Sequence, residues 1–175
     1  MTRRLIVTLL RKDIATYHKK LKEELKQKFN VKQALKTNPP SHITLKYNFK
    51  NEKLPEIKKI LQDFAKQKKP SKYEIRGVDS FDKKVIYLKI RASKEMKKAH
   101  TKLLQTLKNI TPLRKYDKAQ NYHVTLALRD IGEKYEEIMK HLQNKKPCFQ
   151  TYFNNVAILK LEKKEWIIEE KYEFT

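Results

Sequence analysis

Polar and apolar residues alternate along two short segments of the chain, residues 42–49 and 123–129. Because successive side chains of a β-strand point to opposite faces, each segment predicts a strand with one polar and one apolar face. The apolar faces are expected to anchor both strands in a core. The polar faces carry His42, Thr44, Lys46 and Asn48 in the first segment, and His123, Thr125, Ala127 and Arg129 in the second.

Apolar residues spaced three and four apart predict amphipathic helices elsewhere in the chain. One helix is expected to begin after Asp13, acting as its N-cap, and to end near Phe29; another is expected after Ser93, also as an N-cap, ending near Leu107. Two further helices are expected over residues 54–68 and 133–142.

These elements recur in the same order in both halves of the chain, which indicates an internal repeat. After each alternating segment come a helical stretch, a Lys-Lys-Pro break and two strand-like runs, over residues 73–78 and 85–90 and then 149–161 and 165–174. Short turns between these runs favour antiparallel hairpins. We therefore predict an α+β fold with two pseudo-symmetric lobes, in which two antiparallel sheets line a central cleft with helices outside, as a single domain over residues 1–175.

The same pattern, His-x-Thr-Leu, occurs in both alternating segments, as His42-Ile43-Thr44-Leu45 and His123-Val124-Thr125-Leu126. A single copy would be interpreted as an ordinary half-buried histidine in a strand. Two copies in matching contexts favour an acid and a base facing one substrate, because histidine, with a reference pKa of about 6.5, exchanges protons at neutral pH.

The 175 residues carry a formal net charge of +22, from 42 Lys and Arg against 20 Asp and Glu. Such a surplus fits a polyanionic partner such as RNA, because cations that neutralise phosphates release counterions. Only seven of the basic residues are arginine, the residue preferred for bidentate phosphate recognition. A solvated lysine-rich surface therefore explains the charge equally well.

Other kinds of site find no support in the sequence. One Cys and five scattered His provide no zinc-ligand pair, and the two glycines, Gly77 and Gly132, begin neither a P-loop nor a dinucleotide-binding motif. The other histidines, in Lys- and Glu-rich helical stretches, are expected at the surface: His18, His100 and His141. No apolar run approaches the roughly 20 residues of a membrane span. The lone Cys148 is expected to be an unpaired structural thiol in a cytoplasmic protein.

The paired motifs resemble a known family. Two His-x-Thr motifs about eighty residues apart, each on a strand of a duplicated lobe, are similar to the 2H phosphoesterase superfamily, which includes the 2′-5′ RNA ligase-like cyclic phosphodiesterases. Within it the chain looks most like the YjcG-like branch, through Pro39-Pro40, residues 78–81 leading into 85–89, and a closing hairpin with Trp166. It departs from the family pattern directly before the two histidines, where Ser41 and Tyr122 stand.

The resemblance implies a V-shaped, water-filled cleft with both motifs on its floor, and neither a metal nor another cofactor. It makes His42 and His123 the acid/base pair, while Thr44 and Thr125 hold phosphate oxygens. Further along the same strand faces, Lys46 and Arg129 are candidates for phosphate binding, or exposed cations at strand ends. The candidates for base stacking, for each of which core packing is the alternative, are Tyr47, Tyr87, Tyr122 and Trp166.

Three functions are open on this basis. The first is an enzyme that hydrolyses 2′,3′-cyclic phosphate ends of RNA, or acts on 2′-5′ linkages, by two-histidine acid/base catalysis; the resemblance implies release of the 3′ oxygen. The second is an enzyme that cleaves small signalling nucleotides such as cyclic oligonucleotides or 2′-5′ oligoadenylate. The third is a noncatalytic RNA-binding protein, although two intact motifs argue against it. A monomer without a membrane partner is expected in each case.

Overall fold

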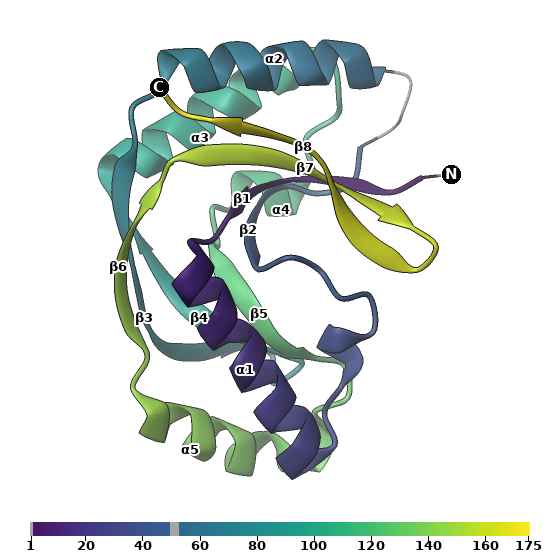
Figure 1. Cartoon of the computed structure of the whole chain (residues 1–175), viewed down its shortest axis with the longest axis vertical. Coiled ribbons are helices and arrows are strands. Elements are labelled where there is room, and N and C mark those ends of the chain that lie inside the picture. The colour runs from purple at the N-terminus through teal and green to yellow at the C-terminus, as the bar shows by residue number, and fades with distance from the viewer. Residues whose placement is uncertain (1, 50–52) are drawn as a thin grey trace.

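The structure, a computed structural model, describes residues 2–49 and 53–175. Each predicted helix is present in the predicted order, and each alternating segment forms a strand that ends earlier than predicted, at Lys46 and at Leu128 (Figure 1). The elements are β1 (Arg4–Leu9), α1 (Lys12–Phe29), the 3-10 helix η1 (Gln33–Leu35), β2 (His42–Lys46), α2 (Leu54–Gln67), β3 (Ser71–Phe81), β4 (Val85–Ala92), α3 (Lys94–Leu107), α4 (Lys115–Lys118), β5 (His123–Leu128), η3 (Gly132–Lys134), α5 (Tyr135–Lys145), β6 (Cys148–Phe153), β7 (Asn155–Glu162) and β8 (Glu165–Glu173).

The strands form two four-stranded antiparallel sheets, which confirms the predicted α+β class and its duplicated arrangement. The first sheet has the order β2-β1-β7-β8 and the second the order β5-β4-β3-β6, so each places a motif strand at one edge. The first sheet is built from the two ends of the chain and the second from its middle. The strands of one sequence repeat are therefore divided between the two sheets.

The prediction of one strand over residues 149–161 is wrong, because the run divides at Asn154 into β6 and β7. β6 pairs with β3 in the second sheet, whereas β7 crosses over and pairs with β1 in the first. Asn155 holds this crossing chain beside β1: its side chain accepts a hydrogen bond from Leu9 N (2.9 Å) and donates one to Leu9 O (3.0 Å).

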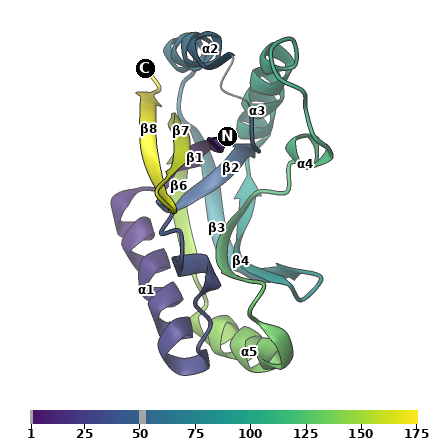
Figure 2. The same ribbon diagram turned by 90° about the vertical axis from the view of Figure 1, so that its right-hand side faces the viewer.

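The helices lie at the two ends of the molecule, with α2 and α3 at one end and α1 and α5 at the other (Figures 1 and 2). All four contribute to one continuous hydrophobic core that also takes side chains from both sheets; its helical members include Ile14, Leu61, Leu103 and Ile138. No helix in residues 2–49 or 53–175 combines the length and the apolar character that crossing a membrane requires.

Of the two predicted N-cap residues, one is confirmed and the other is wrong. Ser93 caps α3 as predicted, since its hydroxyl accepts a hydrogen bond from Met96 N at 3.1 Å. Asp13 does not cap α1, because the helix begins at Lys12, two residues earlier than predicted, and Arg11 is the N-cap. Asp13 lies instead in the first turn, where a carboxylate is favoured by the helix dipole, and it accepts a hydrogen bond from the Arg11 side chain at 2.6 Å.

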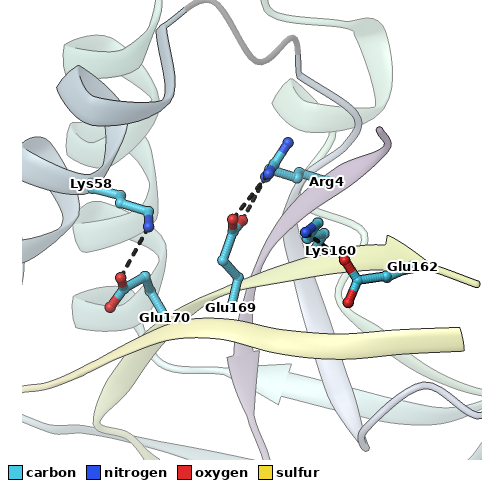
Figure 3. Close-up of polar contacts among 6 residues, drawn as sticks. All are labelled: Arg4, Lys58, Lys160, Glu162, Glu169 and Glu170. Carbon is cyan, nitrogen blue, oxygen red and sulfur yellow. Dashed lines mark hydrogen bonds and ion pairs between the residues drawn. The ribbon is translucent and has the colours of Figure 1, made fainter. Parts of the chain in front are cut away.

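Basic residues of the first sheet and of the neighbouring helix α2 are paired with carboxylates of β7 and β8 (Figure 3). Buried Arg4 on β1 donates to Glu169 on β8 at 2.9 Å, and Lys58 on α2 donates to Glu170 at 3.0 Å. Lys160, directly opposite Arg4 on β7, pairs with Glu162 at 2.8 Å. These cations are neutralised within the protein, so this part of the surface contributes little to any polyanion-binding charge.

Candidate active site

The first motif strand contains a β-bulge directly after its threonine. Along β1, Val7 lies opposite Thr44 but the next residue, Ile6, lies opposite Lys46, so Leu45 is the extra residue of β2. A bulge of this kind shifts the alternation of the residues that follow it. Lys46 therefore leaves the face that carries His42 and Thr44.

The second motif strand repeats this bulge at the same place. Tyr87 of β4 lies opposite Thr125 and its neighbour Ile86 lies opposite Ala127, so Leu126 is the extra residue of β5. Both strands are edge strands, where bulges commonly re-aim side chains near active sites. The two halves thus present His and Thr in the same local geometry.

The two motif histidines are held by equivalent hydrogen bonds. His42 Nδ1 lies 2.6 Å from Pro40 O, and His123 Nδ1 lies 2.6 Å from Asn121 O. A carbonyl oxygen can only accept, so Nδ1 carries the hydrogen in each ring. In the neutral tautomer Nε2 is then the free acceptor, and within residues 2–49 and 53–175 it has no hydrogen-bond partner in either ring.

Two adjoining hollows open beside these strands. The large hollow, of about 700 Å³, is lined by His123, by both motif threonines and by Tyr47. The small hollow, of about 260 Å³, is lined by His42 and shares three wall residues with the large one: Thr125, Leu128 and Arg129. The paired motifs therefore border one divided cavity, with a histidine in each part.

Lys46 does not bind substrate, which corrects the prediction made from simple alternation. Its side chain is fully buried, and Nζ donates to Asp117 Oδ2 (3.1 Å), Pro112 O (3.0 Å) and Tyr47 O (3.2 Å). An ammonium group has three hydrogens, and all three are used here. Asp117 also accepts from Tyr47 N at 2.8 Å, so the pair fixes the end of β2 to α4.

The four aromatic candidates divide into two kinds. Tyr47 lines the large hollow, with its ring centroid 6.0 Å from that of Tyr116, and Trp166 lines the small hollow. Tyr122 also lines the large hollow, but Tyr87 and Tyr122 are each only 8% exposed, which leaves little ring surface for a base to stack on. Tyr87 packs against the His123 ring at 5.4 Å between centroids, and the Tyr122 hydroxyl is bonded to a histidine described below.

The second half also contributes an aromatic contact that sequence reasoning missed. Phe81, at the end of β3, meets the His123 ring edge-to-face with 5.1 Å between centroids, and it lines the large hollow. Arg114 and Tyr116, near the start of α4, line the same hollow. The periodicity of apolar residues could not identify Arg114 and Tyr116, because the helix at which they lie has only four residues.

His18 and His100 are buried, which overturns their expected place at the surface. His18 of α1 donates from Nε2 to Thr125 O at 2.7 Å, and His100 of α3 donates from Nε2 to Leu45 O at 2.8 Å. Each therefore links a helix to the motif strand of the opposite sheet. His141 is partly buried beside Glu24, with 3.3 Å between His141 Nε2 and Glu24 Oε2.

The other nitrogen of each buried histidine bonds the residue directly before a motif. His18 Nδ1 lies 2.7 Å from Ser41 Oγ, and His100 Nδ1 lies 2.9 Å from Tyr122 Oη. Both histidines are the seventh residue of their helix, counted from Lys12 and Lys94. This shared spacing is the signal that would have identified them as a second pair.

Burial governs the protonation of these histidines. It lowers the pKa of His42 to about 4, and the positive charge of Lys22 lowers it further while the Pro40 carbonyl opposes the shift. Burial also lowers the pKa of His123, where the Asn121 carbonyl acts in the opposite direction. The pKa of His18 falls to about 3 for the same main reason. All three rings are therefore neutral at neutral pH.

Arg129 is exposed and lines both hollows directly after β5, where its backbone adopts a left-handed φ of 68°. It thus stays a candidate for phosphate binding. No group of three or more His, Cys, Asp or Glu side chains that could hold a metal ion occurs within the described ranges. Cys148 begins β6 and its free thiol is exposed.

Comparison with known proteins agrees with this geometry. A family model described as the 2′-5′ RNA ligase superfamily matches residues 11–165. The fold is similar to that of TT0787 of Thermus thermophilus, at 17% identity and a TM-score of 0.69 over 98% of this chain and 97% of that one. It is also similar to E. coli LigT complexed with 3′-AMP, at 10% identity and a TM-score of 0.60 over 99% and 98% of the two chains.

No protein of curated function matches the chain in sequence. Assignment to the YjcG-like branch therefore stays a prediction. Membership of the superfamily does not depend on that assignment. Because the family model spans most of the chain, this chain belongs to the 2′-5′ RNA ligase superfamily, the LigT-like 2H phosphoesterases.

Proposed function

We propose that the protein is a metal-independent phosphodiesterase that hydrolyses 2′,3′-cyclic phosphate, or 2′-5′-linked, ends of RNA by two-histidine acid/base catalysis. One observation carries the proposal: His42 and His123 are fixed by equivalent Nδ1 hydrogen bonds of 2.6 Å, which leaves both Nε2 atoms free beside one divided cavity. In-line displacement at phosphorus needs a base and an acid on opposite sides, and two pseudo-symmetric histidines supply them.

The difference between the halves supports one assignment of the two roles. Burial, with a contribution from Lys22, lowers the pKa of His42 to about 4, so we assign His42 as the base that takes a proton from water. The water oxygen bonds to phosphorus as the bond to the ribose 3′ oxygen breaks. His123 then donates its proton to that oxygen, since the negative phosphate in the cavity favours the protonated form of His123.

Charge on the phosphoryl oxygens needs donors in place before the reaction. The Thr44 and Thr125 hydroxyls lie two residues beyond the histidines and line the large hollow, where each can donate to a nonbridging oxygen. Arg129 adds a cation at the junction of the two hollows. Tyr47 and Tyr116 offer ring faces on which a base can stack.

Relatives of the same fold support nucleotides as the ligand class. E. coli LigT has been crystallised with 3′-AMP, with ATP and with NADP+. A nucleotide bearing a terminal phosphate is therefore the first ligand to test.

The test is a substrate panel incubated with excess EDTA: an oligoribonucleotide ending in a 2′,3′-cyclic phosphate, a 2′-5′-linked oligoadenylate and a cyclic dinucleotide. Phosphorus NMR identifies the products, and the doubly substituted protein His42→Ala/His123→Ala controls for contaminating nucleases. We expect the first two substrates to be hydrolysed, with a 2′-phosphate formed from the cyclic end.

Two results would replace the proposal. Turnover of only the cyclic dinucleotide would favour an enzyme of small signalling nucleotides. Tight RNA binding without turnover of any substrate would favour the noncatalytic alternative.

A further inference from the structure

Lys22 is a buried cation without a partner. Its residue is 4% exposed, and throughout residues 2–49 and 53–175 its ammonium group makes neither a hydrogen bond nor an ion pair. Burial lowers its pKa accordingly. The other buried lysine, Lys46, has all three hydrogens bonded. Lys22 lines the small hollow, and because a largely buried ammonium group without an anionic partner is unfavourable, it indicates a ligand that supplies the missing anion there.

The fold itself does not require a cation at this place. Lys22 follows His18 by four residues in α1, and the residue that follows His100 by four in α3 is Leu104. Leu104 is buried to a similar extent, with 6% exposed. The paired half therefore satisfies the same helical position with an apolar side chain, and the lysine is specific to the His42 side.

The small hollow in front of Lys22 is positively charged. Its wall includes Lys22, Arg3 and Arg129, and none of the described residues that line it is acidic. The Arg3 guanidinium lies over the Trp166 ring at 6.0 Å from its centroid. Cations from three separate segments thus converge beside an aromatic face, a combination that suits a phosphate attached to a base or sugar.

Specific hydrogen bonds hold the wall of this hollow in place. Asp130, after β5, accepts from Lys32 N at 2.8 Å and from Gln33 N at 2.9 Å, which fixes η1 against the motif strand. Trp166 N donates to Thr37 O at 2.9 Å and so anchors the β7–β8 hairpin to the segment before β2. The shape of the hollow is therefore set by contacts within the protein itself.

We propose that the small hollow is a second phosphate subsite, with Lys22 as its buried cation, which binds a phosphate one nucleoside away from the phosphate held between His42 and His123. This inference rests on the proposed function, and it sharpens the substrate class: a nucleotide chain with at least two phosphates is preferred over a mononucleotide. His42 and Lys22 share the hollow, so the second phosphate binds beside His42, the proposed catalytic base.

The test compares the binding of 3′-AMP and adenosine 3′,5′-bisphosphate, which differ by one phosphate, by isothermal titration calorimetry. We expect the bisphosphate to bind at least about tenfold more tightly to the unsubstituted protein, as one charge-assisted contact of ~1.4 kcal/mol would provide. Lys22→Met should lose this preference. Lys20→Met, which removes the same charge from an exposed position of the same helix, should keep it.

Two results would overturn the inference. One is equal affinity for both nucleotides, or a preference that survives in Lys22→Met. The other is a Lys22→Met protein that loses affinity for both nucleotides to the same degree, because Lys22 would then hold the phosphate between the histidines. Circular dichroism verifies that Lys22→Met is folded, and Leu104 shows that an apolar residue fits the equivalent position.

Separate results test the second phosphate subsite and the phosphodiesterase activity. Bisphosphate binding through Lys22 with no turnover of any substrate would remove the phosphodiesterase and leave the subsite. Turnover of cyclic phosphates without a preference for the second phosphate would do the reverse.

Discussion

The His42 half and the His123 half agree in the geometry of their motif histidines and differ in almost everything around them. Both have a bulge after the threonine and an Nδ1 bond to the carbonyl two residues earlier. Each also has a buried histidine at the seventh position of an earlier helix, α1 or α3. The His42 side has Lys22 and a small cationic hollow. The His123 side has Phe81, Tyr87 and a large hollow.

Under the proposed function, symmetry is kept where the reaction needs it and lost where the substrate is recognised. In-line displacement treats the two sides of phosphorus alike, so matched histidines serve it. A nucleotide has a base and sugar on one side and another group on the other, so unlike walls suit it. The unequal surroundings also affect protonation, because Lys22 contributes to the lowered pKa of His42 and not to that of His123.

The largest expected effect tests the shared chemistry. His42→Ala and His123→Ala should each lower kcat by about 10²- to 10⁴-fold, because each proton transfer contributes a factor of that size. The unsubstituted protein should show a bell-shaped dependence of kcat/KM on pH. Its acid limb near pH 4 belongs to His42, which must lose its proton, and its alkaline limb below about pH 6.5 belongs to His123, which must keep its proton.

The pH profiles of the two variants should then differ. His42→Ala loses the acid limb and His123→Ala the alkaline limb, when residual kcat/KM is measured from pH 3.5 to 8. Near-normal turnover in either variant would contradict the paired mechanism. Loss of the opposite limbs would keep the pair and exchange the two roles.

The next prediction tests the position four residues after each motif histidine, where the first half has Lys46 and the second half has Ala127. Lys46→Met should lower the free energy of unfolding by about 3–5 kcal/mol, because Asp117 is left as a buried, unpaired carboxylate. Urea denaturation measures this loss of stability. The double variant Lys46→Met/Asp117→Asn should recover part of it, because the unpaired carboxylate is removed. Unchanged stability with a raised KM would instead return Lys46 to the substrate site.

A third prediction concerns the buried histidine that links α1 to the opposite motif strand. The pKa of His18 is about 3 in the folded protein, below its unfolded value of 6.5, so the unfolded chain takes up a proton that the folded one excludes. Stability should therefore fall as pH drops from 6.5 toward 3, by on the order of 3 kcal/mol near pH 4.

His18→Gln isolates this effect, because glutamine can donate to Thr125 O and accept from Ser41 without titrating. Denaturation at pH 7 and pH 4 should show a smaller acid loss for this variant than for the unsubstituted protein. His141→Gln, at a partly exposed position, is the control. An equal acid loss in His18→Gln would mean that His18 does not carry the dependence.

Local patterns were sufficient to locate the motif residues and insufficient to predict their surroundings. Alternation and the repeat located His42, His123 and their threonines, because a strand fixes its own side-chain directions. They misplaced Lys46, since the bulge at Leu45 arises from pairing with β1. The buried state of His18 and Lys22 depends on packing between distant segments, and an uninterrupted apolar run hid the crossover at Asn154.

The smallest effect is expected at the junction of the two halves, where Arg129 lines both hollows. Arg129→Asn removes the guanidinium and keeps a residue that tolerates the left-handed φ of 68°. KM for a cyclic-phosphate oligonucleotide should rise about tenfold with kcat little changed, because a cation that grips substrate and transition state equally affects binding alone. The slope of log(kcat/KM) against log salt should become shallower by about one unit.

The matched control for Arg129→Asn is Arg91→Asn, at an exposed arginine of β4 that lines neither hollow. Stability should change by less than ~0.5 kcal/mol in Arg129→Asn, as at other surface positions, so a change in KM would not reflect unfolding. Equal KM values and equal salt slopes for the two variants would show that Arg129 borders the cavity without binding phosphate, and would leave Lys22 as the cation that distinguishes the two sides.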